Sequence, residues 1–437
     1  AMTSATDVKR ILSRHLLADG MEIIVDLDAS EGSWLVDKRN GDRYLDCFSM
    51  FASMAVGFNH PDIVEMSDYL GRLAIQKPAN SDIYTEAMAE FSETFSQIAM
   101  PTYLPHAFFI EGGALAVENC LKAAFDWKVK RNFESGMQKE SGHQIIHFKQ
   151  AFHGRSGYTL SITNTADPRK TRYFPTFDWP RITNPKRNFP YTNEGLEQTI
   201  ALEQQAIAEI KQAIHHNGPD IAGLIIEPIQ GEGGDNHFRI EFFKELRKIC
   251  DENDILFIMD EVQSGVGITG KFWAHEHTGI TPDLISFGKK TQVCGMLGST
   301  RLDETESSVF TESSRINSTF GGNLVDMARC SAILKIIENE NLLENVRLRG
   351  EELRGGLEDL ATQHPKIISS PRGTGLMCAF DLKDTTARDE FLVQLLREKV
   401  LLVGCGEKSI RFRPHLNITK DEIGIILSTL HTVITTR

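Results

Sequence analysis

The alternation of strand-like and helix-like stretches between about residues 106 and 320 is the feature that most limits what this chain can fold into. Short apolar runs, typical of buried strands, alternate with longer stretches that have the periodicity of helices. The strand-like runs are 106–110, 144–148, 221–226, 255–259 and 284–287, and the helix-like stretches are 114–130, 194–215 and 240–252. Such alternation predicts an α/β fold with a mainly parallel sheet covered by helices.

The rest of the chain predicts a second, smaller unit. A helix is expected near 324–340, and the segments after it (367–368, 375–382, 389–398, 401–403, 409–412 and a last helix from 421) are typical of a compact α+β domain. Short strands between 23 and 47 have no core of their own and are expected to join this tail. We therefore expect an N-terminal segment of 1–65 that packs with the small domain, a large domain of 66–322, and a small domain of 323–437.

Charge and cysteine content exclude several classes of partner. The 47 basic and 60 acidic side chains give a formal net charge of -13, which argues against a nucleic acid or an anionic membrane as a partner. Residues 1–19 mix charged and apolar side chains and lack the long apolar core of a signal peptide or membrane span. The seven cysteines are scattered and form no CxxC pair, as expected for free thiols in a reducing cytoplasm.

Candidate binding residues follow the first two strands, where ligands bind in open α/β sheets. The stretch EGGA (111–114) opens a helix, and small residues there let backbone N–H groups approach a phosphate. A plain strand-to-helix turn is the alternative. In AFHGR (151–155), Phe152 can lie against a flat aromatic ligand and Arg155 can hold a carboxylate. A packed phenylalanine and a solvated arginine are the alternative.

Charged residues follow the next three strands. The glycine-rich loop EPIQGEGG (227–234) carries two carboxylates that can serve acid–base chemistry or pair with an arginine, or simply face solvent. Asp260 ends an apolar strand, where a charge requires a partner such as a protonated heterocyclic nitrogen; a helix N-cap is the alternative. Lys289 comes just after Gly288 and a strand end, which suits a Schiff-base lysine, although a lysine pair is more often surface charge.

Three other motifs are coincidental. The GxGxxG match at 265–270 opens no helical pattern and has no acidic residue about 20 positions on in a βαβ unit, so dinucleotide binding is not expected. The HEH triplet at 275–277 has no companion set with zinc-ligand spacing, and no metal is expected. The Asp260–Glu261 pair lacks the preceding GxxxxGK[ST] loop of a nucleotide-binding P-loop.

The order of the five motifs, more than any one of them, resembles the class III (subgroup II, ω-type) aminotransferases. The similarity continues through NSTFGGN (317–323), RGTGL (372–376) and RFRP (411–414), and therefore covers essentially the whole chain. The resemblance implies the aspartate-aminotransferase-like fold type I of pyridoxal-phosphate-dependent transferases. It also implies pyridoxal 5′-phosphate as the cofactor and a homodimer as the assembly.

The same resemblance assigns roles to individual residues. Lys289 matches the Schiff-base lysine, Asp260 the aspartate that pairs with the pyridine nitrogen, and Thr319 the threonine that reaches the phosphate of the neighbouring subunit's cofactor. The remaining cofactor contacts are Gly113 and Ala114 at the phosphate, Phe152 against the ring and Gln263 near the 3-hydroxyl. Arg155 and Arg411 match the two carboxylate-binding arginines, and Glu232 matches the residue that switches Arg411 off.

Within that family, the sequences of four longer passages are most similar to the L-lysine ε-aminotransferase branch. The passages that carry this are EGGALAVENCLKAAFDWK (111–128), FHGRSGYTLSITNT (152–165), EPIQGEGGDNHF (227–238) and GKKTQVCG (288–295). The similarity implies transfer of the ε-amino group of L-lysine to 2-oxoglutarate, giving L-glutamate and a semialdehyde that cyclises. Ornithine, acetylornithine or 4-aminobutyrate as the donor, a mutase or racemase that uses the same cofactor, and a catalytically silent relative are the open alternatives.

Overall fold

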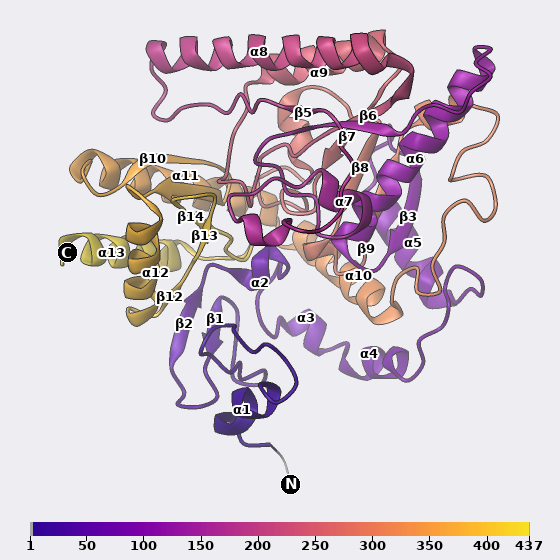
Figure 1. Cartoon of the computed structure of the whole chain (residues 1–437). Helices are drawn as coiled ribbons and strands as arrows, with labels where there is room; N and C mark the ends of the chain where they lie inside the picture. Colours follow the sequence, from indigo (N-terminus) through magenta and orange to yellow (C-terminus); the bar gives the residue numbers. More distant parts are fainter. Residues whose placement is uncertain (1–2, 437) are drawn as a thin grey trace.

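The computed structural model describes residues 3–436, and a central sheet of seven strands organises them (Figure 1). Along the sheet the order is β3-β9-β8-β7-β6-β4-β5. The strands are β3 (His106–Ile110), β4 (Gln144–Phe148), β5 (Arg181–Ile182), β6 (Ile221–Ile226), β7 (Leu256–Asp260), β8 (Leu284–Phe287) and β9 (Cys294–Gly298). Strand β9 runs antiparallel to β3 and β8, and the other paired strands are parallel. The prediction of a mainly parallel sheet is confirmed.

Both faces of the sheet are buried, which explains why its strands are continuously apolar. In β7, Leu256 and Ile258 pack into a core cluster that contains residues of helix α6, whereas Phe257 and Met259 pack into the cluster on the opposite face. Successive side chains of a strand point to opposite faces, so a strand covered on both sides needs an apolar residue at every position. The covering helices include α5 (Glu86–Ile98), α6 (Gly113–Glu134), α8 (Asn193–Asn217), α9 (Ile240–Glu252) and α10 (Leu324–Asn339).

Some elements were not expected from the sequence, and two of them are substantial. Strand β9 was missed, and so was the 22-residue helix α11 (Leu342–Gln363). Glycine weakens a helical pattern, and α11 contains three glycines. Two of them are needed for close packing: a Cβ at Gly350 would lie 2.2 Å from the carbonyl oxygen of Gly375, and one at Gly356 would lie 2.4 Å from the side chain of Leu427.

The two ends of the chain share smaller sheets beside the central one (Figure 1). Strand β2 pairs in parallel with β12, so a three-stranded sheet contains both N-terminal and C-terminal segments. The strands of the smaller sheets are β1 (Trp34–Val36), β2 (Arg43–Asp46), β10 (Ser369–Thr374), β11 (Met377–Asp381), β12 (Val400–Leu401), β13 (Val403–Cys405) and β14 (Ser409–Phe412). The domain boundaries at residues 65 and 322 stay a prediction.

The remaining helices lie around these sheets. They are α1 (Val8–Leu12), α3 (Pro61–Val64), α4 (Ser67–Ala74), α7 (Gly157–Ser161), α12 (Thr385–Arg397) and α13 (Lys420–Thr435). None of the helices within residues 3–436 combines the length and the apolar character that crossing a bilayer requires. All seven cysteines are buried free thiols.

A left-handed turn, α2 (Ser49–Ala52), joins the N-terminal segment to the central sheet. Its four residues have φ between 43° and 67°, a conformation that costs an L-residue roughly 1–2 kcal/mol each. Carbonyl oxygens of this turn and of the residue after it accept hydrogen bonds from side chains that lie 238 or 239 residues further along the chain. Those of Phe51, Ala52 and Ser53 accept hydrogen bonds at 2.8 Å from Lys289, Lys290 and Gln292, respectively.

Lys290 is a buried anchor rather than a surface lysine. It is 1% exposed, and burial, followed by the charges of Arg413 and Lys289, holds its pKa well below the ordinary lysine value. Its amine donates a hydrogen bond to the carbonyl oxygen of Ala52. The alternative that this lysine pair is surface charge is therefore wrong for Lys290.

Replacing Lys290 should destabilise the fold. Lys290→Ala leaves the Ala52 carbonyl unpaired and creates a cavity, which together should lower the free energy of unfolding by about 2–4 kcal/mol. Lys290→Met retains most of the volume and loses the donor, so it should cost roughly half as much. Urea unfolding of the three proteins measures both effects. Unchanged midpoints in both variants would contradict an anchoring role for the Lys290 amine.

Candidate active site

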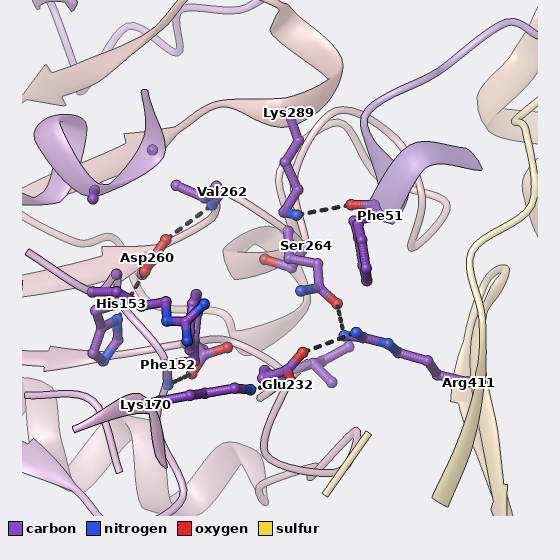
Figure 2. A pocket seen from close by; sticks show the side chains of 17 residues that line it. Phe51, Phe152, His153, Lys170, Glu232, Asp260, Val262, Ser264, Lys289 and Arg411 are labelled. Carbon is purple, nitrogen blue, oxygen red and sulfur yellow. Dashed lines mark hydrogen bonds and ion pairs between the residues drawn. The ribbon is translucent and has the colours of Figure 1, made fainter. Parts of the chain in front are cut away.

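A cavity of about 650 Å³ lies where the loops after five strands of the central sheet meet (Figure 2). Most of the residues predicted to bind cofactor or substrate line it: Gly113, Ala114, Phe152, Arg155, Glu232, Asp260, Gln263, Lys289 and Arg411. Thr319 does not line this cavity and is exposed in the segment that precedes α10. Side chains that are up to about 300 residues apart in the sequence thus face one space.

Lys289 enters the cavity from the 3₁₀ turn η5 (Lys289–Thr291), directly after β8. The preceding Gly288 lies in a tight space, since a Cβ there would be 3.0 Å from the sulfur of Cys294. The Lys289 amine donates to the carbonyl oxygen of Phe51 at 2.8 Å (Figure 2). Burial, followed by the charges of Arg411 and Arg413, lowers the pKa of Lys289 to about 8. A substantial fraction of this amine is therefore neutral and nucleophilic near physiological pH.

Asp260 is a buried carboxylate held by three donors. Its Oδ2 lies 2.8 Å from Nδ1 of His153, and its Oδ1 accepts hydrogen bonds of 3.0 Å from the Ser286 hydroxyl and the Val262 backbone N–H. In the part of the chain that the structure describes, no helix begins between β7 and η4 (Ala274–Thr278). The alternative of a helix N-cap for Asp260 is therefore wrong. The carboxylate is oriented, buried and directed at the cavity.

Glu227 connects two loops at the floor of the cavity. Its carboxylate accepts a 3.0 Å hydrogen bond from the backbone N–H of Phe152 and a 3.1 Å bond from that of Gly231. Burial raises its pKa to about 7, against the opposing effect of His153. The alternative of a solvent-facing carboxylate is wrong for Glu227, because it is buried and holds the Phe152 loop on the glycine-rich loop.

Glu232 forms ion pairs with two cations. Its Oε2 lies 2.8 Å from Nη2 of Arg411, which projects from β14, and its Oε1 lies 2.9 Å from Nζ of Lys170 (Figure 2). Gln263 helps to hold Arg411 in place, since its Oε1 accepts hydrogen bonds from Arg411 at 3.2 Å and from Arg413 at 2.8 Å. The charge of Arg411 is therefore balanced by Glu232.

Sequence reasoning missed three residues of the site. His153 belongs to the FHGR motif, so the motif itself could have drawn attention to it as a partner for a carboxylate. Phe51 comes from a left-handed turn that no pattern in the sequence predicts. Lys170 ends the 3₁₀ turn η2 (Pro168–Lys170) in an irregular segment, and nothing in the sequence separates it from a surface lysine.

The side chains present fit pyridoxal phosphate. The phenyl ring of Phe152 and the apolar side chain of Val262 both line the cavity, which suits a flat ring. The buried Asp260 carboxylate suits a protonated ring nitrogen. Helix α6 begins at this cavity with Gly112 as an N-cap that has no side-chain hydrogen bond, which leaves the first backbone N–H groups free for a phosphate. A Cβ at Gly154 would lie 2.7 Å from that of Ala114, so the space beside this helix end requires glycine.

The lowered pKa of Lys289 gives a test that does not depend on turnover. In protein freed of cofactor, reductive methylation of Lys289 should rise with pH as the amine loses its proton and should be half-maximal near pH 8. Free N-acetyl-lysine, with a pKa of about 10.4, should still be gaining reactivity above pH 9. Peptide mass spectrometry across a pH series measures the site-specific rate. A half-maximum at or above pH 10 would rule out a depressed pKa at Lys289.

Comparison with known proteins places these features in a family. The family model described as aminotransferase class-III matches residues 17–434. An L-lysine-epsilon aminotransferase of Amycolatopsis lactamdurans is 48% identical over 425 residues, covering 96% of this chain and 93% of the relative. The human mitochondrial 4-aminobutyrate aminotransferase is 32% identical over 428 residues, covering 91% and 82%. The solved structure of a lysine aminotransferase from M. tuberculosis in the internal aldimine form has a TM-score of 0.97 and 47% identity, covering 99% of this chain and 100% of that chain.

Proposed function

The chain belongs to the class-III aminotransferases, and we propose that it transfers the ε-amino group of L-lysine to 2-oxoglutarate. Its cofactor is pyridoxal 5′-phosphate. Relatives named L-lysine-epsilon aminotransferases share 47–48% of their residues with it over nearly full length, against 32% for 4-aminobutyrate aminotransferases. The products would be L-glutamate and 2-aminoadipate 6-semialdehyde, which cyclises to a piperideine carboxylate.

The residues that would hold the cofactor follow from the site. When bound, pyridoxal phosphate supplies an electron sink that stabilises negative charge on the carbon bearing the reacting amine. We assign Asp260 to the ring nitrogen, where its carboxylate keeps a proton in place. At about 4 Å and an effective dielectric of about 20, such a charge pair is worth roughly 4 kcal/mol, which is about three pKa units. Phe152 would contact the ring, Gln263 would lie near its 3-hydroxyl, and Gly113 and Ala114 would bind the phosphate.

Lys289 carries out the proton transfer. Its amine is partly neutral near pH 8, so it can accept a proton from Cε of the donor lysine and release it again. His153 and Ser286 hold the Asp260 carboxylate in one orientation while this occurs. The side chain of Phe51 also lines this cavity.

The Glu232–Arg411 ion pair is the observation that carries the choice of an ω-amino donor. An α-amino acid reacting at its α-amine would place a carboxylate beside the reacting carbon, where a free arginine would bind it. L-lysine attacked at its ε-end presents methylenes there, and an unpaired buried arginine would be costly. Glu232 neutralises Arg411 at 2.8 Å. We assign the remote α-carboxylate of lysine to Arg155, an exposed residue of the cavity lining.

The direct test is incubation of the purified enzyme with L-lysine and 2-oxoglutarate. The cyclised product, trapped with an aldehyde reagent, should appear together with an equal amount of glutamate. Ornithine, acetylornithine and 4-aminobutyrate serve as matched donors, and each should react more slowly than lysine. Faster turnover of 4-aminobutyrate than of lysine would replace the donor while leaving the family unchanged.

Removing the charge of Glu232 should affect the two half-reactions unequally. Glu232→Gln leaves Arg411 unneutralised, so the lysine half-reaction should slow by about tenfold or more, since a charge-assisted pair is worth roughly 1.5–3 kcal/mol. The 2-oxoglutarate half-reaction should slow less, and glutamate should gain as a donor relative to lysine. Single-turnover absorbance traces measure each half-reaction. Equal slowing of both would show that Glu232 does not discriminate between the substrates.

We further propose a cytoplasmic homodimer in which Thr319 donates a hydrogen bond to the phosphate of the neighbouring subunit's cofactor. Thr319 is exposed and does not line the cavity of its own chain, as this arrangement requires. The adjoining segment is anchored, because the Ser318 carbonyl accepts a 3.0 Å hydrogen bond from Ser81. Phe320 is 39% exposed next to it, which suits an apolar contact between subunits.

A further inference from the structure

Lys170 is the second cation on Glu232. We propose that it is a positioning residue that keeps hold of Glu232 when a substrate carboxylate takes over Arg411, and that it thereby sets the preference between the two substrates. This inference rests on the proposed function, in which one pocket accepts both lysine and 2-oxoglutarate. No part of the family resemblance assigned a role to Lys170.

The two ion pairs of Glu232 can be broken independently. Arg411 binds Oε2 at 2.8 Å and Lys170 binds Oε1 at 2.9 Å, so loss of the first contact leaves the second in place. Arg411 is nearly fully buried, with a side chain 4% exposed, whereas those of Lys170 and Glu232 are 20% and 25% exposed. In Figure 2, Glu232 lies between Lys170 and Arg411, so a carboxylate displaced from the buried cation can stay on the more accessible one.

Counting charges shows why the second cation matters. Without substrate, the formal charges of Arg411, Lys170 and Glu232 sum to +1. An incoming α-carboxylate brings the net charge of the group to zero, with one ion pair between the substrate and Arg411 and a second between Glu232 and Lys170. If Lys170 were neutral, the same carboxylate would leave Glu232 as an unpaired anion in a partly buried site, which is unfavourable. The other ion pairs around this group are internally balanced: Arg413 with Asp235, Arg169 with Asp167, and Arg388 with Asp389.

The structure also provides space for the displaced carboxylate. A second cavity of about 280 Å³ adjoins the first, and Lys170 and Glu232 line both. Its other walls include Thr165, Asp167 and Arg388. Glu232 thus lies between two cavities, with Lys170 at the boundary.

The motion is a side-chain rotation, because the backbone around Glu232 is fixed. The Glu232 carbonyl accepts a 2.8 Å hydrogen bond from the N–H of Gly406. A Cβ at Gly231 would lie 2.3 Å from the Gln263 side chain, and one at Gly233 would lie 2.1 Å from the carbonyl oxygen of Gln150. These glycines serve close packing, so the loop is held while the carboxylate turns.

Glu232 is an anion in this setting. Burial alone would raise its pKa, but Arg411 and then Lys170 outweigh burial and hold the pKa below the ordinary glutamate value. The carboxylate is therefore an anion in this arrangement, and a substrate carboxylate that takes over Arg411 would leave it in need of another cation. The Lys170 amine also lies 5.8 Å from the centre of the Phe152 ring, which lines the first cavity as Lys170 does.

Half-reactions of Lys170→Met test the proposal, with Arg169→Met as the matched control. Arg169 is the preceding residue, carries the same charge and has a side chain that is 75% exposed. Enzyme loaded with pyridoxamine phosphate reports the 2-oxoglutarate half-reaction without any amino donor. In Lys170→Met the apparent affinity for 2-oxoglutarate should fall about ten- to a hundredfold, as for loss of one charged hydrogen bond. The lysine half-reaction should change less than about threefold, because the Glu232–Arg411 pair remains.

Two further measurements complete the experiment. Glutarate has both carboxylates and no reacting group, so its calorimetric dissociation constant should rise in Lys170→Met and stay unchanged in Arg169→Met. Lys170→Arg should restore both the glutarate affinity and the 2-oxoglutarate reaction. If the wild-type enzyme reacts with 2-oxoglutarate but Lys170→Met and Arg169→Met show the same affinities and rates, this inference alone is overturned. A wild-type enzyme that does not react with 2-oxoglutarate would overturn the proposed function and this inference together.

Discussion

Burial of the central sheet on both faces is the constraint on which the rest of this structure depends. Strands β5, β4, β6, β7 and β8 pair in parallel with their neighbours, so their carboxyl ends lie at one edge of the sheet. Since the faces are covered by helices, that edge is where polar side chains can reach a ligand. Asp260 and Lys289 occupy it because β7 and β8 are adjacent and end together, with Asp260 paired to Ser286 in the register.

Charge balance is the second organising principle, and it explains the site better than shape does. Asp260 is buried with three donors, Glu227 with two backbone N–H groups, and Arg411 with Glu232 and Gln263. Each is expensive to bury without its partner. Lys289 is the exception, since its pKa is lowered to about 8 by burial and by Arg411 and Arg413. The group that must become neutral to react thus forms no ion pair with a carboxylate in the part of the chain that the structure describes.

The elements predicted from periodicity agree closely with the structure where the pattern is strong. Strands 106–110, 144–148, 221–226 and 284–287 and helix 240–252 have the predicted bounds. Strand β9 was missed because its glycines, Gly295 and Gly298, and the lysine motif before it obscure the pattern of a strand. Gly295 is nevertheless required there, because a Cβ would lie 2.1 Å from the carbonyl oxygen of Phe108. Helix α11 was missed for the same reason, as its glycines permit close packing that only the folded chain displays.

The sequence by itself determined the class of fold through its periodicity. Its resemblance to the class III aminotransferases then indicated the cofactor and many of the cavity-lining residues. Tertiary structure alone decided which charges meet. Three contacts join segments far apart in the chain: the ion pair of Lys170 with Glu232, the hydrogen bond from Lys290 to the Ala52 carbonyl, and the hydrogen bond from Lys289 to the Phe51 carbonyl of the left-handed turn. The sequence does not distinguish a solvated lysine from a buried one, because the pKa of a lysine depends on burial and on neighbouring charges that only folding brings together.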